Sequence, residues 1–102
     1  MPGVARDGDA TTTGHDCDAT TTVTGPTGAT AKVYANEIAI ECIGNPTAAH
    51  TIDLSAGCIP HAAVINAGSS TVFVGGIGVA RIGDSTDGGA ITSGSANVIV
   101  GG

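Results

Sequence analysis

Three histidines and three cysteines are the residues of this chain best suited to binding a metal ion. Two of the histidines lie close to cysteines, in the segments 15–17 (His-Asp-Cys) and 58–61 (Cys-Ile-Pro-His), and His50 precedes the second segment by eight residues. Structural zinc is usually held by four Cys or His ligands in a closed tetrahedron. Two loops could present such a set. We therefore predict one structural zinc ion per chain, with the ligands His15, His50, Cys58 and His61.

The cysteines leave other arrangements open. Their number is odd, so a framework of disulfides alone would leave one thiol unpaired. Cys17 could replace Cys58 as the ligand, or it could form a disulfide with Cys58. Cys42 falls on a predicted strand and is expected to be a small packing residue. A single loop histidine is usually solvated, but three of them with a cysteine on two loops favour a metal site.

Composition and motifs argue against several classes of function. The formal net charge is −6 with only three Lys and Arg residues, whereas nucleic-acid binding depends on basic contacts to phosphate. No apolar run reaches the length of a membrane span, and no secretory leader pattern is present. The paired motifs of zinc deaminases are missing, and Asp16 and Asp53 are the only loop carboxylates near the candidate site. We expect a protein that is not an enzyme.

The elements that must position this site are expected to be short strands. The chain has 102 residues, enough for one domain, with 17 glycines and only 2% aromatic residues. Its apolar residues are mostly Ala, Val and Ile, and Thr is abundant, which favours strands and turns. A core built from such small side chains needs support from a metal, a disulfide or a partner.

Internal repeats predict the architecture. Residues 70–86 align without a gap with residues 31–47, and a third copy is split between residues 95–102 and residues 3–11. Each copy has the pattern of a hairpin, with a tight turn such as Gly75-Gly76 between its two strands. The sequence therefore predicts an all-β fold: a small conical β-prism of three pseudo-threefold hairpin repeats, circularly permuted so that the termini complete one repeat. Arg6 and Arg81, at equivalent positions, are expected to bond loop carbonyls or neighbouring carboxylates, or to lie on exposed strands.

Several ordered motifs resemble those of PAAR-repeat proteins. They are Gly-Val-Ala-Arg at residues 3–6, Gly-Asp-Ser-Thr at residues 83–86, Thr-Gly-His at residues 13–15 and the Cys-x-x-His segment. The resemblance covers nearly the whole chain and implies a single PAAR-like domain over residues 1–102, with one zinc near its point and the same three-His, one-Cys ligand set. The chain departs from the family pattern at residues 40–42 (Ile-Glu-Cys for Val-Ala-Arg), at Asn45, and in the turn at residues 85–89, where many relatives carry a further cysteine.

The resemblance implies a structural role in a contractile injection machine, either a phage tail or a type VI secretion system. Proteins of this family sharpen and cap a trimeric spike protein (VgrG-like, or a phage central spike), with one tip per trimer, and touch the target membrane transiently; effector cargo can dock on them. The expected location is the virion tail tip or the assembled secretion apparatus, after synthesis in the bacterial cytoplasm. The alternatives are a small zinc-binding hydrolase or metal-binding module, and a free β-domain that binds another partner through its hairpins.

Overall fold

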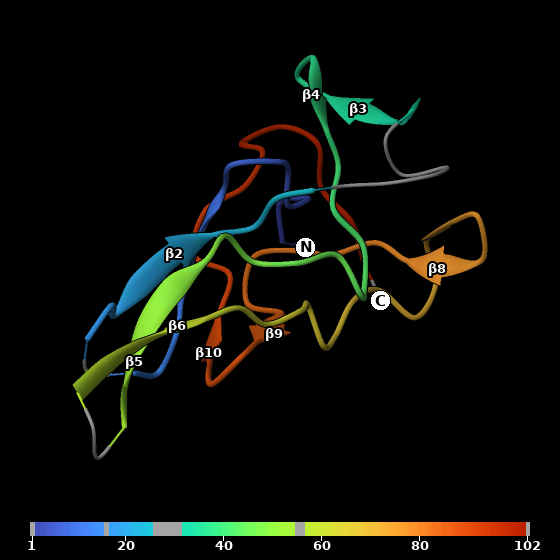
Figure 1. Ribbon diagram of the computed structural model, residues 1–102. Helices are drawn as coiled ribbons and strands as arrows, with labels where there is room; N and C mark the ends of the chain where they lie inside the picture. Colours follow the sequence, from blue (N-terminus) through green and yellow to red (C-terminus); the bar gives the residue numbers. More distant parts are fainter. Residues whose placement is uncertain (1, 16, 26–31, 55–56, 102) are drawn as a thin grey trace.

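Short antiparallel hairpins make up the fold. The computed structural model describes the chain except residues 1, 16, 26–31, 55–56 and 102, and the side chains of residues 53 and 54. The described residues contain ten strands in five two-stranded sheets (Figure 1), which confirms the all-β prediction. The strands are β1 (Ala10–Thr12), β2 (Thr20–Thr22), β3 (Tyr34–Ala35), β4 (Ile38–Ala39), β5 (His50–Leu54), β6 (Gly57–His61), β7 (Phe73–Val74), β8 (Ile77–Gly78), β9 (Ser85–Thr86) and β10 (Gly89–Ala90). Within the described part of the chain there is no helix that is long and apolar enough to cross a membrane.

A closed ring of backbone hydrogen bonds joins the three copies of the repeat. The amide of Ala5 donates to the carbonyl of Ala80, that of Ala80 to Glu41, and that of Glu41 to Ala5, each over 2.9 Å. These are the three equivalent positions in the sequence alignment. Isolated β-bridges repeat the same cyclic order in the pairs Val4–Arg81, Cys42–Val79 and Arg6–Ile40. The copies are therefore arranged around an approximate threefold axis.

The two ends of the chain complete the third copy, as the sequence predicts. Gly3 forms a β-bridge with Ile99, and the amide of Val4 donates to the carbonyl of Val98 over 2.9 Å. The segments next to the two ends of the chain consequently lie side by side (Figure 1). The first residues are an integral part of the fold.

The core consists of two small groups of buried side chains. Val4, Ile40 and Val79 pack in one of them, with Ala35, Cys42 and Val100. The other contains Ala5, Val23, Ile65, Ala80 and Ile91. Small side chains are required because the backbones approach closely: a Cβ atom on Gly78 would lie 2.6 Å from the carbonyl oxygen of Ser69. Full burial of Cys42 confirms that it packs in the core.

In two copies of the repeat, an arginine forms an ion pair with an aspartate three residues further along the chain. The guanidinium of Arg81 donates to Asp84 over 2.9 and 3.0 Å and also reaches the carbonyls of Gly68 and Gly101. Arg6 bonds Asp9 in the same way over 3.1 and 3.2 Å. This confirms the expected contacts to carboxylates and carbonyls. In the middle copy Cys42 and Asn45 stand at these positions, so that copy has no such ion pair.

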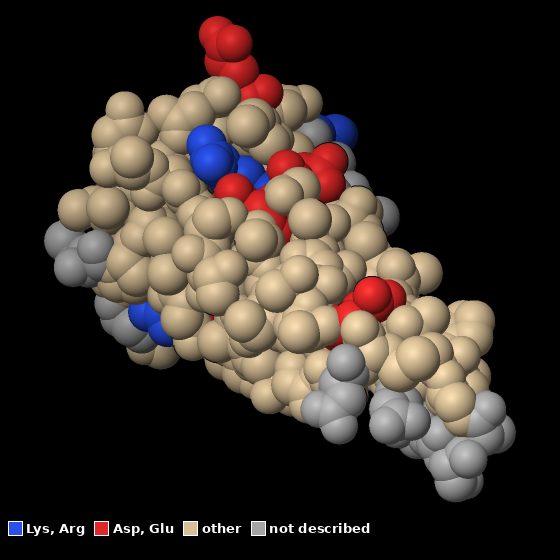
Figure 2. Space-filling model, turned by 90° about the vertical axis from the view of Figure 1, so that its left-hand side faces the viewer, with Lys and Arg blue, Asp and Glu red and all other residues tan. Residues whose placement is uncertain are grey.

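The molecule is elongated, measuring 41 × 25 × 23 Å, and it narrows towards one end (Figure 2). The β5–β6 hairpin, the longest of the five, extends away from the body on the side opposite β8 (Figure 1). The β1–β2 hairpin runs beside it, and an amide–carbonyl bond of 2.7 Å from Ala48 to Thr22 joins the two. These two hairpins and the β9–β10 turn carry the residues of the candidate site.

Candidate metal centre

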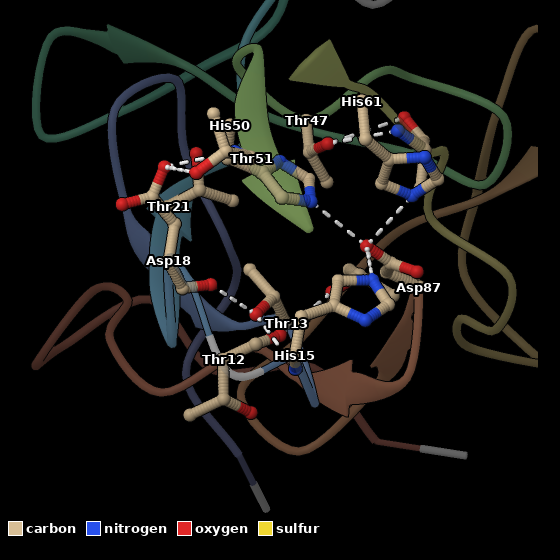
Figure 3. A network of polar contacts seen from close by, with 12 residues as sticks. Thr12, Thr13, His15, Asp18, Thr21, Thr47, His50, Thr51, His61 and Asp87 are labelled. Carbon is tan, nitrogen blue, oxygen red and sulfur yellow. Dashed lines mark hydrogen bonds and ion pairs between the residues drawn. The ribbon is translucent and has the colours of Figure 1, made fainter. Parts of the chain in front are cut away.

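The three histidines of the chain converge on one carboxylate (Figure 3). The Nε2 atoms of His15, His50 and His61 lie 2.8, 2.9 and 3.1 Å from Oδ2 of Asp87. One potential ligand atom from each of the four residues lies within 4.8 Å of all the others. No other group of this kind occurs among the residues that the structure describes. The cluster could hold a metal ion.

Strand pairing explains how two of the histidines meet. His50 is the first residue of β5 and His61 is the last residue of β6, and the two are directly opposite each other in the antiparallel register. Side chains of opposite residues project from the same face of a hairpin, a few ångströms apart. The hairpin register therefore places both imidazoles at its open end, where the strands leave the body.

The loop between β1 and β2 supplies His15. The amide of His15 donates to Thr13 Oγ1 over 3.1 Å, which shapes the turn before the imidazole. Asp18, at the other end of the loop, accepts hydrogen bonds from the amide and the hydroxyl of Thr51 over 2.8 and 2.9 Å. These bonds lower the pKa of the Asp18 carboxyl and attach the loop to β5 (Figure 3). The disulfide between Cys17 and Cys58 attaches the same loop to β6.

Asp87 is presented by the tight turn between β9 and β10. Its φ angle is 43°, in the left-handed region, which Asp tolerates better than most residues other than Gly. Burial alone would raise the pKa of this carboxyl, but hydrogen bonds from His50, His15 and His61 outweigh it and hold the pKa below its ordinary value. Asp87 therefore carries a negative charge among three imidazoles.

The tautomer of His50 favours a cation at the centre of the group. Its Nδ1 lies 2.9 Å from the carbonyl oxygen of Ala48, which can only accept, so Nδ1 carries a proton. A neutral His50 then directs the lone pair of Nε2 at Asp87, an arrangement that is repulsive without a positive charge between the two. A cation bound between the two would supply that charge.

The three distances from the Asp87 oxygen to the imidazole nitrogens are close to those expected around a small divalent ion, and the four ligand atoms together lie within 4.8 Å of one another. Bonds of about 2.0–2.2 Å from imidazole nitrogen and carboxylate oxygen to zinc give a tetrahedron with edges of about 3.3 Å. The separations of 2.8–3.1 Å between Nε2 and Oδ2 are shorter by only a few tenths of an ångström. Binding of an ion would require the four donors to rearrange around it.

The predicted ligand set needs one correction, at Cys58. The structure brings His15, His50 and His61 together, but Cys58 forms a disulfide with Cys17, with their Cα atoms 5.9 Å apart, so neither sulfur is a free thiolate. Cys58 and His61 lie three residues apart on one strand, where side chains alternate between faces, and they point to opposite sides. The prediction treated this segment as a turn that could present both side chains to one ion. The disulfide is the alternative that the sequence left open.

Asp87 is the ligand candidate that the sequence reasoning missed. The signal was present, because the turn at residues 85–89 is the place where many PAAR relatives carry a further cysteine. Only cysteine and histidine were considered as ligands, so an aspartate there was passed over. Asp16, considered as a loop carboxylate near the site, lies outside the described residues, and so does the side chain of Asp53.

Sequence comparisons add no family assignment to this geometry. The chain matches no protein-family model, and no curated protein sequence is significantly similar to it. Its function must therefore be argued from the threefold arrangement of the copies and from the cluster itself.

Proposed function

We propose that this protein is the metal-stabilised tip of a spike in a contractile injection machine, a phage tail or a type VI secretion system. The proposal rests above all on an exposed apolar surface that is repeated three times around the axis of a single chain. The resemblance of the sequence motifs to PAAR-repeat proteins points to the same role. The proposed function is mechanical, and the metal site would stabilise the structure.

The apolar surface occupies equivalent positions in the three copies. Tyr34, Phe73 and Ile99 each lie opposite the equivalent residue of the second strand, and they are 61, 54 and 51% exposed. The residue before each of them is an exposed valine; we call these six residues the apolar ring: Val33, Tyr34, Val72, Phe73, Val98 and Ile99. Positions related by a threefold axis share one height along it, so these residues form a single ring around the axis. Phe73 belongs to β7, which pairs with β8, and β8 lies on the side of the molecule opposite the β5–β6 hairpin (Figure 1). Clustered exposed apolar side chains are typical of a binding surface.

A trimeric spike protein fits this ring best. A monomer with three similar faces can cap a true threefold end with one copy, because each face meets one subunit of the trimer. Three moderate contacts then act together and none has to be strong. Covering the end of a trimeric β-helix would also protect its unpaired strand edges. The partner we propose is a VgrG-like or phage central spike protein.

We assign zinc to the cluster of His15, His50, His61 and Asp87. Imidazole and carboxylate donors suit zinc, and four protein donors complete its tetrahedral coordination. A hydrolase would need an open position for water, which a four-ligand site does not leave. The ion would tie together the β1–β2 loop, the β5–β6 hairpin and the β9–β10 turn. In this proposal the metal stiffens the end of the molecule that meets the target envelope.

The stoichiometry of the complex tests the proposal. The purified protein is mixed with a trimeric β-helical spike protein from the same genome, and the mass of the complex is measured by native mass spectrometry. One chain per spike trimer is the expected result. Three chains per trimer, or no complex with any such spike, would contradict the proposal.

A pair of variants locates the contact. Phe73→Ser lies in the apolar ring, and we expect it to weaken spike binding at least tenfold. Val64→Ser is a matched control, because Val64 is also exposed (46%) but lies outside the ring. Equal effects of the two changes would mean that the ring is not the docking surface.

A further inference from the structure

One buried carboxyl group breaks the symmetry of the three copies. Glu41 belongs to the ring of backbone hydrogen bonds with Ala5 and Ala80, so two copies place a methyl group where the third places a carboxyl. All three residues are fully buried, with 0% of their surface exposed. A charged side chain at such a position is costly unless it is paired and hydrogen-bonded.

Glu41 has no such partner among the described residues. Neither of its carboxyl oxygens accepts or donates a hydrogen bond there, and the amide nitrogen of the neighbouring Asn45 side chain is also unpartnered. In the other two copies an arginine neutralises the buried carboxylate that is present there. Asp9 and Asp84 are buried too, but each receives an arginine of its own copy. The middle copy has Cys42 in place of that arginine, so no guanidinium reaches Glu41 from its own hairpin.

The charges around Glu41 oppose its ionisation further. The acidic groups that act on it come from the segment before β1, namely Asp7 and Asp9. The one cation of that segment, Arg6, is engaged by Asp9 and by the side-chain oxygen of Asn36. The titratable group next to it in the chain is the buried thiol of Cys42, whose pKa is itself raised by burial and by Glu41 to about 11. The nearby side-chain amide of Asn45 favours the carboxylate, but burial and the negative charge of Asp7 outweigh it.

We propose that Glu41 is a pH switch at the centre of the fold, held as the neutral acid in the folded domain and loosening the threefold ring when it ionises. Burial, followed by the charge of Asp7, raises the pKa of Glu41 from 4.5 to about 8. The folded protein then binds one more proton than the unfolded chain between these two values. The contribution of Glu41 to stability is therefore greatest in acid and falls as the pH rises through this window. The switch depends neither on the metal cluster nor on the proposed function.

The test compares the unfolding of the metal-loaded protein with that of Glu41→Gln between pH 4 and 9. Gln is a neutral isostere, so contributions common to both proteins, such as those of the histidines, cancel in the difference. We expect the unfolding constant of the wild type, relative to the variant, to rise about tenfold per pH unit between pH 5 and 8. Glu37→Gln is the control, since it makes the same chemical change on an exposed residue and should leave the pH dependence as in the wild type. A wild-type to Glu41→Gln ratio that stays constant with pH would overturn the proposal.

A direct titration keeps the proposal testable if the Gln variant does not fold. The carboxyl carbon of Glu41 is followed by NMR in the wild-type protein, with Glu41→Ala, which restores the residue of the other two copies, to assign the signal. A midpoint near pH 8 is expected. A midpoint below pH 5 would show that Glu41 ionises like an exposed glutamate, and the switch would be refuted.

Discussion

The two ends of this molecule are held together in different ways. Around the threefold axis, the three copies join through backbone hydrogen bonds, such as those among Ala5, Glu41 and Ala80. Small buried apolar side chains pack beside these bonds. No described side chain of β5 or β6 belongs to the two buried apolar groups. Polar and covalent contacts hold that end instead: a cluster of three histidines with Asp87, the Asp18–Thr51 bonds and a disulfide. The first mechanism depends on repetition in the sequence, and the second depends on single residues. Variants in the two regions should therefore have different effects.

The largest effect is expected from deletion of residues 1–8. These residues supply Val4 and Ala5, both buried, and one third of the backbone ring. The whole stability of a small domain is about 5–15 kcal/mol, and the loss of one strand of the third copy should exceed it. Circular dichroism should show no cooperative thermal unfolding. A variant that melts like the full chain would mean that the N-terminal segment is dispensable.

Removal of the metal should affect the other end of the molecule most. If the ion is present at a thousandfold excess over its Kd, chelation should cost about 4 kcal/mol of stability. Hydrogen exchange should rise first in β5, β6 and the β1–β2 loop, while the amides of the threefold ring stay protected. His50→Ala should reproduce this pattern, whereas uniform loss of protection over both regions would contradict the separation.

Variants at Cys58 distinguish the effect of the disulfide from the effect of the metal. The double change Cys17→Ser with Cys58→Ser should lower stability by about 2–4 kcal/mol, since a link across 41 residues is lost. The metal content should nevertheless remain near one ion per chain, because neither sulfur belongs to the cluster. Asp87→Ala should give the reverse result, with the disulfide intact and the metal lost. Loss of metal on removal of both cysteines, measured by elemental analysis, would restore Cys58 as a ligand.

The smallest effect is expected from Asp18→Ala. The change removes the bonds to Thr51 that dock the His15 loop on β5, so the melting temperature should fall slightly and metal affinity a few-fold. The pKa of Asp18 is lowered in the folded protein, so its stabilisation is present above the ordinary carboxyl pKa of 3.8 and is lost as the pH falls through the lowered value. The difference in melting temperature between wild type and variant should disappear in strong acid. A difference that persists there would assign it to packing.

Repetition made the body of the fold predictable from the sequence. The aligned copies indicate the hairpins, and the split third copy indicates that the termini meet, as the Gly3–Ile99 bridge confirms. The histidines were also evident, because they are few and lie near cysteines. The rest of the site depends on register and turn geometry. Whether Cys58 faces His61 is decided by strand alternation, and Asp87 reaches the cluster only through a turn with positive φ.

An image of this protein bound to a trimeric spike protein tests the proposed function most directly. Electron cryo-microscopy of the complex should show one chain on the threefold axis of the trimer, with Tyr34, Phe73 and Ile99 each against one subunit. The metal cluster should lie at the free end, with density for one ion among His15, His50, His61 and Asp87. A complex in which the β5–β6 hairpin faces the spike and the apolar ring is exposed to solvent would contradict the account.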